Sequence, residues 1–193
     1  MLIGIVSDIH CNSPALRRAL DLMGEVDELI CLGDSISEYR FSNEVVGLLR
    51  DRQCIAIQGN HEQMFFSPAG ARARSAPWID HELLSWLSLQ PGRRVLEREG
   101  REILLVHSTS WPSGGQYVCA HDRDFARFAE TGADVVLYGH THQPVIQHVG
   151  NTLVINPGSA GEARPGDGGL TLSCAILDVT RLEARIIEFP LPT

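Results

Sequence analysis

The sequence lacks any hydrophobic run long enough to cross a bilayer, and this absence limits the class of protein. No stretch approaches about 18 consecutive apolar residues. Met1 leads directly into residues 2–6 without the charged segment and small-residue cleavage site of a signal peptide. With 193 residues, 44% of them hydrophobic, the chain has ordinary globular composition and length for one sizeable core. We therefore expect a single domain over residues 1–193, in the cytoplasm and away from membranes.

Paired cysteines and an excess of positive charge are also missing. The five cysteines are odd in number and scattered, without a Cys-x-x-Cys pair, which favours reduced thiols over disulfides or a zinc knuckle. The net charge of −8 argues against a nucleic-acid partner bound through its backbone phosphates. Arginines between positions 72 and 101 alternate with acidic residues, as on a solvated surface. An anionic substrate would therefore need bound cations that reverse the local sign of the charge.

Short apolar segments alternate with helix signals in the first two thirds of the chain. Segments 2–6, 29–32, 54–57, 103–106 and 135–138 have the length and β-branched content of buried strands. Ser13, Ser42 and Asp80 can cap helices, and residues 125–129 resemble a fourth helix that ends near Gly132. Alternation of strand and helix predicts a mostly parallel sheet covered by helices.

The pattern changes after residue 138. Segments 144–149, 152–155, 170–178 and 184–188 are strand-like and are joined by turns and a Gly-rich stretch, which predicts antiparallel or mixed pairing. Residues 64–76 are the least regular part of the sequence, and we expect a surface loop or short helix there.

Residues that bind metal ions follow each of the five early apolar segments. In chain order they are Asp8-Ile9-His10, Gly33-Asp34, Gly59-Asn60-His61-Glu62, His107 and Gly139-His140-Thr141-His142. The carboxyl ends of strands in an open parallel sheet lie along one edge, so these side chains are expected to converge. The i, i+2 spacing in two of the motifs would place both side chains on one side of an extended backbone. The glycines suit a close approach of backbone to the site.

The ligand types indicate the kind of metal site. Carboxylate, imidazole and amide oxygen together suit Mn, Fe, Zn, Ni or Co better than calcium or a thiolate-bound zinc. Seven ligands are too many for one tetrahedral ion, but fit two ions about 3.5–4 Å apart that share a carboxylate. Two such ions lower the pKa of a shared water, so that hydroxide can attack phosphorus.

These motifs, with the later Asn156-Pro157-Gly158-Ser159, resemble in type and order those of the calcineurin-like metallophosphoesterase superfamily, especially its small single-domain bacterial and archaeal phosphodiesterases. The resemblance implies an α/β fold, a four-layer α/β/β/α sandwich with mixed sheets. It implies that Asp8, His10 and His142 hold one metal, that Asn60, His107 and His140 hold the other, and that Asp34 bridges them. Manganese is the metal we expect first. His61 would protonate the leaving group as a general acid, with its orientation fixed by Glu62. Catalytic roles thus fall to His61, Asp34 and Asn60.

Two departures from the family pattern concern the substrate. Many of the smallest members have cysteine where this chain has His61, which suggests activity on poorer leaving groups. The loop 109–117 after His107 is the expected substrate wall, where Trp111 or Tyr117 could stack on a nucleoside; a surface loop with a packed aromatic is the alternative. Arg164 could return to the phosphate on a flexible loop, or could be an ordinary surface arginine.

The leading function is therefore a metal-dependent phosphoesterase acting on a small phosphorylated substrate, a nucleotide included, through a phosphodiester or phosphomonoester bond. Nucleotidase, dinucleoside polyphosphate hydrolase and protein phosphatase are alternatives in the same superfamily. A catalytically inactive metal-binding scaffold, like the retromer subunit of this fold, and a metal-binding regulator are alternatives of another class. Retention of every ligand and of His61 argues against the scaffold. The sequence does not determine the oligomeric state.

Overall fold

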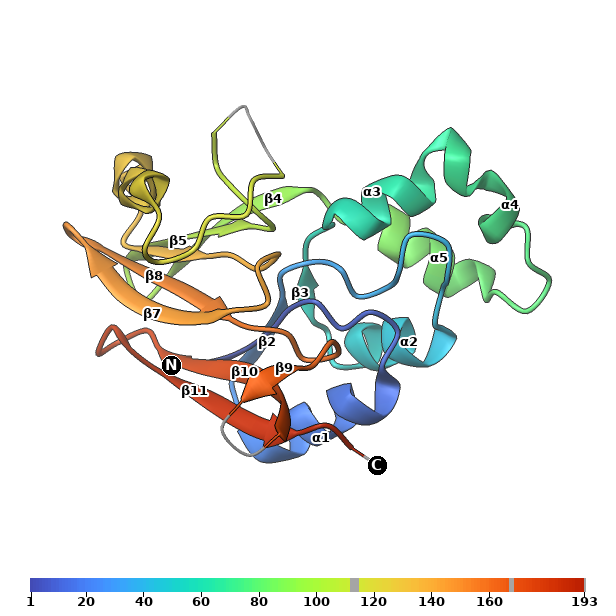
Figure 1. The fold of residues 1–193 in the computed structure, drawn as a ribbon, viewed down its shortest axis with the longest axis horizontal. Coiled ribbons are helices and arrows are strands. Elements are labelled where there is room, and N and C mark those ends of the chain that lie inside the picture. The colour runs from blue at the N-terminus through green and yellow to red at the C-terminus, as the bar shows by residue number, and fades with distance from the viewer. Residues whose placement is uncertain (112–114, 167–168, 193) are drawn as a thin grey trace.

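The computed structural model describes residues 1–111, 115–166 and 169–192, which form two facing β-sheets with helices outside them (Figure 1). Pro112, Ser113 and Gly114 of the predicted substrate loop lie outside the described residues.

The first sheet holds the N-terminal strands and the C-terminal hairpin. Its order is β11-β10-β1-β2-β3, with β9 paired to β10. β1, β2 and β3 are mutually parallel, whereas β10 runs antiparallel to β1. The strands are β1 (Leu2–Val6), β2 (Glu28–Cys31), β3 (Ile55–Ala56), β9 (Arg164–Gly166), β10 (Gly169–Asp178) and β11 (Glu183–Pro190).

The second sheet is formed from the middle of the chain in the order β4-β5-β6-β8-β7. β5, β6 and β8 are parallel, and the edge strands β4 and β7 are antiparallel to their neighbours. The strands are β4 (Arg93–Arg98), β5 (Arg101–Val106), β6 (Val135–Leu137), β7 (Pro144–Val149) and β8 (Thr152–Pro157).

Helices cover the outer faces, so the predicted α/β sandwich with mixed sheets is confirmed. Residues such as Ile5, Ile30, Leu105 and Ile155 form the core between the sheets. The helices α1 (Ser13–Met23) and α2 (Asn43–Asp51) pack on the first sheet. A 3-10 helix, η2 (Arg123–Thr131), packs on the second. Figure 1 shows α1 below one sheet and the yellow η2 segment above the other.

A small separate core joins the remaining helices beside the sheets. These are α3 (Asn60–Phe66), η1 (Pro68–Gly70), α4 (Ala71–Arg74) and α5 (His81–Ser88). Phe65 of α3 is buried there with Phe41, Leu83 and Leu87. The segment 64–76 is therefore short helices rather than a loop. Among the residues described, no helix combines the length and the apolar character needed to cross a membrane.

The structure corrects one prediction about the strands and one about a cap. The five early strands are divided between two sheets, because β5 and β6 pair with β8 rather than with β3. The arginine-rich segment contains the edge strand β4, whose residues are all exposed or half-buried, in agreement with the predicted surface position. The side chain that caps α1 is Asn12, while Ser13 Oγ donates to Glu44.

Candidate metal centre

The predicted metal ligands converge where the carboxyl ends of the two sheets meet. Asp8 and His10 follow β1, and Asp34 follows β2. Asn60 opens α3, His107 follows β5, and His140 and His142 lie in the turn between β6 and β7. The predicted side chains therefore come together although the strands belong to two sheets, because the carboxyl ends of the parallel strands of both sheets lie at the same edge of the sandwich.

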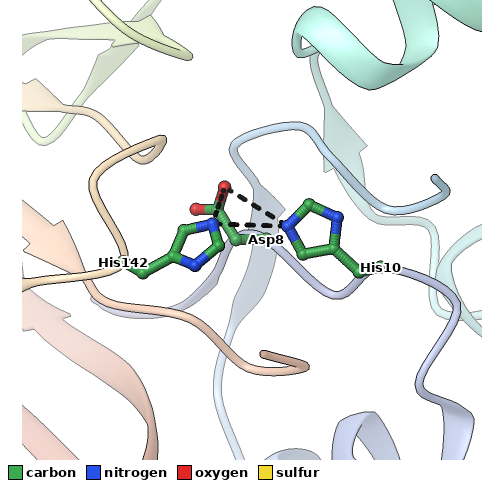
Figure 2. Close-up of side chains that lie close together, drawn as sticks. All are labelled: Asp8, His10 and His142. Carbon is green, nitrogen blue, oxygen red and sulfur yellow. Dashed lines mark hydrogen bonds and ion pairs between the residues drawn. The ribbon is translucent and has the colours of Figure 1, made fainter. Parts of the chain in front are cut away.

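One cluster consists of Asp8, His10 and His142, whose ligand atoms all lie within 4.8 Å of one another (Figure 2). His142 Nε2 lies 3.3 Å from Asp8 Oδ1 and 3.3 Å from His10 Nε2. His10 Nε2 is 4.0 Å from the same carboxylate oxygen. Figure 2 shows one nitrogen of each imidazole ring directed toward the other ring and toward the same carboxylate oxygen.

The second cluster consists of Asp34, His107 and His140, again with ligand atoms within 4.8 Å of one another. Asp34 Oδ2 lies 3.2 Å from His107 Nε2. Asn60 Oδ1 lies 3.0 Å from the same histidine nitrogen, which places the amide oxygen in this cluster as well. A carboxylate, two imidazoles and an amide oxygen are thus directed to one point.

Asp34 connects the two clusters. It belongs to the second cluster, and it also forms a group with His10 and His61 whose ligand atoms lie within 4.8 Å. His10 is itself a member of the first cluster. One carboxylate therefore lies between two sets of ligands, as expected for a carboxylate that two ions share.

Five of the seven predicted metal ligands have left-handed backbone conformations. Asp8, His10, Asp34, His140 and His142 have φ values of 54°, 48°, 51°, 66° and 57°. The i, i+2 pairs thus come together through turns after the strands, and the prediction of extended backbone at these pairs is wrong. Non-glycine residues in this region cost about 1–3 kcal/mol each and persist where function and surrounding structure hold them.

Glycines allow the turns to pack against each other, as the sequence predicts. A Cβ at Gly59 would collide with the Asp34 carboxylate, and a Cβ at Gly139 would collide with the Ser7 hydroxyl. The run 156–159 supports the same turns. Asn156 Nδ2 donates to the carbonyl oxygen of Gly139 at 2.8 Å, and Ser159 Oγ donates to the carbonyl oxygen of Asp8 at 2.7 Å.

The donor set fits divalent cations. Asp8 is fully buried, and its Oδ1 receives no well-oriented hydrogen bond from the described residues. Two imidazole nitrogens face each other at 3.3 Å beside this oxygen. A buried carboxylate oxygen without a donor is costly unless a cation or another positive group lies beside it. Converging carboxylate and imidazole atoms of this kind provide borderline ligands for such a cation.

Three of the imidazole rings have a partner at a second nitrogen, whereas His10 Nδ1 is buried without a partner among the described residues. His107 Nδ1 lies 2.8 Å from the Leu32 carbonyl oxygen, and His142 Nδ1 lies 3.6 Å from the Glu162 carboxylate. His140 Nε2 lies 3.3 Å from the Gly115 carbonyl oxygen, which leaves its Nδ1 for a cation. Such contacts orient metal-binding histidines and select the tautomer. No sequence pattern indicates Glu162, because it lies in a Gly-rich loop that only the fold returns to the site.

Glu62 holds the Asp34 turn in place. Its fully buried carboxylate accepts hydrogen bonds from the backbone N–H groups of Asp34, Ser35, Ile36 and Gly59 and from the Ser35 hydroxyl, at 2.6–3.2 Å. The prediction that Glu62 orients His61 is therefore wrong. The His61 ring instead accepts the backbone N–H of Glu38 at its Nδ1, at 3.1 Å.

Glu62→Gln is expected to lower the free energy of unfolding by about 3 kcal/mol, because its NH₂ group would face N–H donors in a buried site. Urea unfolding of the metal-free protein measures the change. Glu82→Gln is the matched control, because the Glu82 side chain is 90% exposed; it is expected to change stability by less than about 0.5 kcal/mol. Equal stability of Glu62→Gln and wild type would contradict the assigned role.

The carboxylates and imidazoles of the site shift each other's pKa values. Burial opposes charging of His107, but its hydrogen bond with Asp34 and the charges of Asp34 and Asp8 outweigh burial and raise the pKa of His107 to about 9. Burial likewise opposes ionisation of Asp34, but the hydrogen bonds and charges of His107 and His61 hold the pKa of Asp34 below its ordinary value. In the metal-free chain this pair is therefore an ion pair at neutral pH.

The stability of the metal-free protein is expected to fall as pH rises from 6.5 to 9. The folded pKa of His107 lies above its ordinary value, so its contribution is complete below pH 6.5 and is lost as pH passes through about 9. The loss is at most about 3 kcal/mol. Urea unfolding between pH 6 and 9 measures it, with His107→Asn as the variant that must reduce the slope and exposed His121→Gln as the control that must keep it. A flat profile for the metal-free wild type would contradict this pairing.

The structure separates the three predicted substrate residues. Tyr117 is exposed and stacks on the His140 ring, with centroids 4.0 Å apart and planes 26° apart. Trp111 is buried against Phe128 and donates through Nε1 to Gln116, so it matches the alternative of a packed aromatic. Arg164 pairs with Glu188 and donates to Ser173, contacts that hold it on β9 and do not bring it to the clusters.

This arrangement of carboxylates and imidazoles at the carboxyl edges of two facing mixed sheets defines a metallohydrolase of the α/β sandwich class. The calcineurin-like phosphoesterase superfamily domain matches residues 1–182, and the chain belongs to that superfamily. It is accordingly a metal-dependent phosphoesterase.

Individual relatives cover nearly the whole chain. A probable metallophosphoesterase of Methanothermobacter thermautotrophicus is 27% identical over 100% of this chain and 95% of its own length. The phosphodiesterase YfcE of Escherichia coli K12 is 27% identical over 92% of this chain and 88% of its own. The crystal structure of a metallophosphoesterase from Sphaerobacter thermophilus is 25% identical and superposes with a TM-score of 0.74, covering 100% of this chain and 90% of that one.

Proposed function

We propose that this protein hydrolyses a phosphate ester of a small molecule in the cytoplasm, with two divalent cations, manganese first among them. Asp8, His10 and His142 would hold one cation, and Asn60, His107 and His140 the other, with Asp34 between them. The whole chain, residues 1–193, would act as one domain. The names of the relatives, phosphodiesterase among them, support a diester substrate.

One observation carries the proposal: the Asp34 carboxylate belongs to the second cluster and also forms a group with His10, a member of the first. A carboxylate in this position suits two ions rather than two independent sites. Five backbone and hydroxyl hydrogen bonds to Glu62 fix the turn that carries Asp34. The position of this carboxylate is therefore set before any cation binds.

When bound, the two cations would lower the pKa of a water so that it can attack phosphorus, and would neutralise the phosphoryl oxygens. The protein residues supply the proton for the leaving group. His61 Nδ1 accepts the Glu38 N–H, so the neutral ring carries its proton on Nε2. This atom lies 3.8 Å from Asp34 Oδ2 and is on the side of the ring that faces the clusters. Through Nε2–H, His61 can thus hydrogen-bond to the leaving oxygen. To transfer a proton as a general acid the ring must be an imidazolium, in which Nδ1 gives up the Glu38 N–H and keeps a proton of its own when Nε2 releases one.

Tyr117 is the residue best placed to contact the rest of the substrate. It is 70% exposed beside His140, so its ring can stack on a base or an aromatic leaving group. Its contact with His140 also limits rotation of that ring.

Hydrolysis of p-nitrophenyl phosphate, bis(p-nitrophenyl) phosphate, cyclic nucleotides and dinucleoside polyphosphates tests the proposal, with Mn, Ni, Co, Zn and Mg added in turn to metal-free protein. We expect turnover that depends on added metal and is highest with manganese. If the metal-loaded protein left all of these esters intact, a binding scaffold or regulator would replace the enzyme as the account of this site.

A further inference from the structure

A cavity of about 250 Å³ opens beside the second cluster. The metal ligands Asn60 and His107 form one end of it. Gln63 of α3, Arg93 at the start of β4, and Thr109 and Ser110 after β5 form the rest of the wall. A molecule bound at the metal centre can therefore extend into this cavity, whose wall includes several polar side chains.

The topology of the second sheet brings Arg93 to this position. β4 is antiparallel to β5, so the first residue of β4 lies at the edge where the last residue of β5 lies. Arg93 pairs with Val106, the residue immediately before His107. A segment that is 14 positions before His107 in the sequence thus provides a cation next to the metal centre, which sequence spacing alone could not indicate.

Arg93 differs from its neighbours in having no ion-pair or side-chain hydrogen-bond partner among the described residues. Arg94 donates to the Ala56 carbonyl oxygen, and Arg98 pairs with Glu28 at 2.9 Å. Within the described part of the chain, no carboxylate oxygen lies within 4.0 Å of the Arg93 guanidinium. Glu130 lines an adjoining hollow with Arg93, but its ion pair is with Arg127, at 3.8 Å.

The cavity offers a positive charge to an anionic ligand. Arg93 lines it together with the metal-site residues Asn60 and His107, and the Arg93 guanidinium has no ion pair with a described residue. A guanidinium in such a position beside a metal site suits the oxygens of a phosphate group.

We propose that Arg93 binds a second phosphate group of the substrate while the first lies at the metal centre. The preferred substrates would then be phosphate esters whose alcohol part carries another phosphate group. This inference rests on the proposed phosphoesterase function and specifies its substrate class. Arg93 acts as a specificity residue and takes no part in breaking the P–O bond.

The test compares 3-hydroxypropyl phosphate with 1,3-propanediol bisphosphate, which differ only in the second phosphate. For the manganese-loaded wild type we expect kcat/KM for the bisphosphate to be about tenfold higher or more, the effect of a charge-assisted hydrogen bond. Arg93→Gln is expected to remove this preference while leaving kcat/KM for 3-hydroxypropyl phosphate unchanged. Arg93→Lys should keep part of the preference. Arg72→Gln, on exposed α4, is the matched control and should keep all of it.

The inference would be overturned if Arg93→Gln lowered kcat/KM equally for both substrates, or if this variant kept the wild-type preference. Hydrolysis of p-nitrophenyl phosphate would still support the proposed function in either case. 2-Phosphoglycerate and glycerol 2-phosphate differ in a carboxylate. If the preference for 2-phosphoglycerate exceeded the preference for the bisphosphate, Arg93 would bind a carboxylate, and this result would also overturn the inference. If no ester were hydrolysed, the proposed function would fail. The inference is then decided by calorimetry, in which wild type must bind the bisphosphate about tenfold more tightly than the monophosphate and Arg93→Gln must not.

Discussion

Asp34→Asn is expected to lose both catalysis and one of the two metal ions. The side chain keeps its shape and its Oδ1 can still accept the His61 N–H, so the fold should persist. The negative charge between the clusters is lost, however, and with it the bridge on which the pair of cations depends. We expect kcat/KM to fall by about 10³-fold or more, the equivalent of several kcal/mol of transition-state stabilisation.

Metal content by plasma mass spectrometry and hydrolysis of bis(p-nitrophenyl) phosphate, measured on the same samples, check this prediction. Asp21→Asn, on the exposed face of α1, is the matched control and should retain two ions and full rate. Wild-type activity in Asp34→Asn would rule out the bridging role. Loss of helical circular dichroism would instead show that the substitution acts on the fold.

His61→Ala is expected to separate metal binding from proton transfer. His61 lies 3.8 Å from Asp34 and is half-buried at the site, but it contributes to neither of the proposed coordination sets. Its removal should therefore leave two ions bound. Removal of a general acid typically costs about 10²–10⁴-fold, and the cost is greatest when the leaving group is a poor one.

The substitution is expected to lower kcat by different factors for alkyl phosphates and for p-nitrophenyl esters. Alkyl phosphates, which leave as basic alkoxides, should lose about 10²–10³-fold in kcat, whereas p-nitrophenyl esters should lose far less. His121→Ala is the control, because its side chain is 86% exposed and lies outside the clusters. Equal losses on both leaving groups would mean that His61 positions the substrate or a metal and does not donate a proton.

The convergence of the proposed metal ligands could be predicted because each motif is local. Asp8 and His10, or His140 and His142, are two residues apart, and each pair follows an apolar segment that forms a strand. The residues that support them could not be predicted in the same way. Glu62 reaches a turn 28 positions earlier in the chain, and Arg93 reaches the site through an antiparallel pairing that its own sequence does not reveal.

Aromatic and charged loop residues gave the least certain signal. Trp111 and Tyr117 lie six positions apart in one loop, yet one is buried against η2 and the other is exposed beside His140. Composition cannot distinguish these outcomes, because an aromatic ring suits both a core and a stacking site. The same applies to Arg164, whose pairing with Glu188 depends on the register of β9, β10 and β11.

The central claim is that two cations act together across Asp34, and a manganese titration of the metal-free protein tests it most directly. Hydrolysis of bis(p-nitrophenyl) phosphate and the electron paramagnetic resonance spectrum are recorded in the same samples. We predict that activity rises mainly with the second equivalent of manganese per chain, together with the spectrum of an exchange-coupled pair. Full activity at one equivalent, with only the spectrum of isolated ions, would contradict the account.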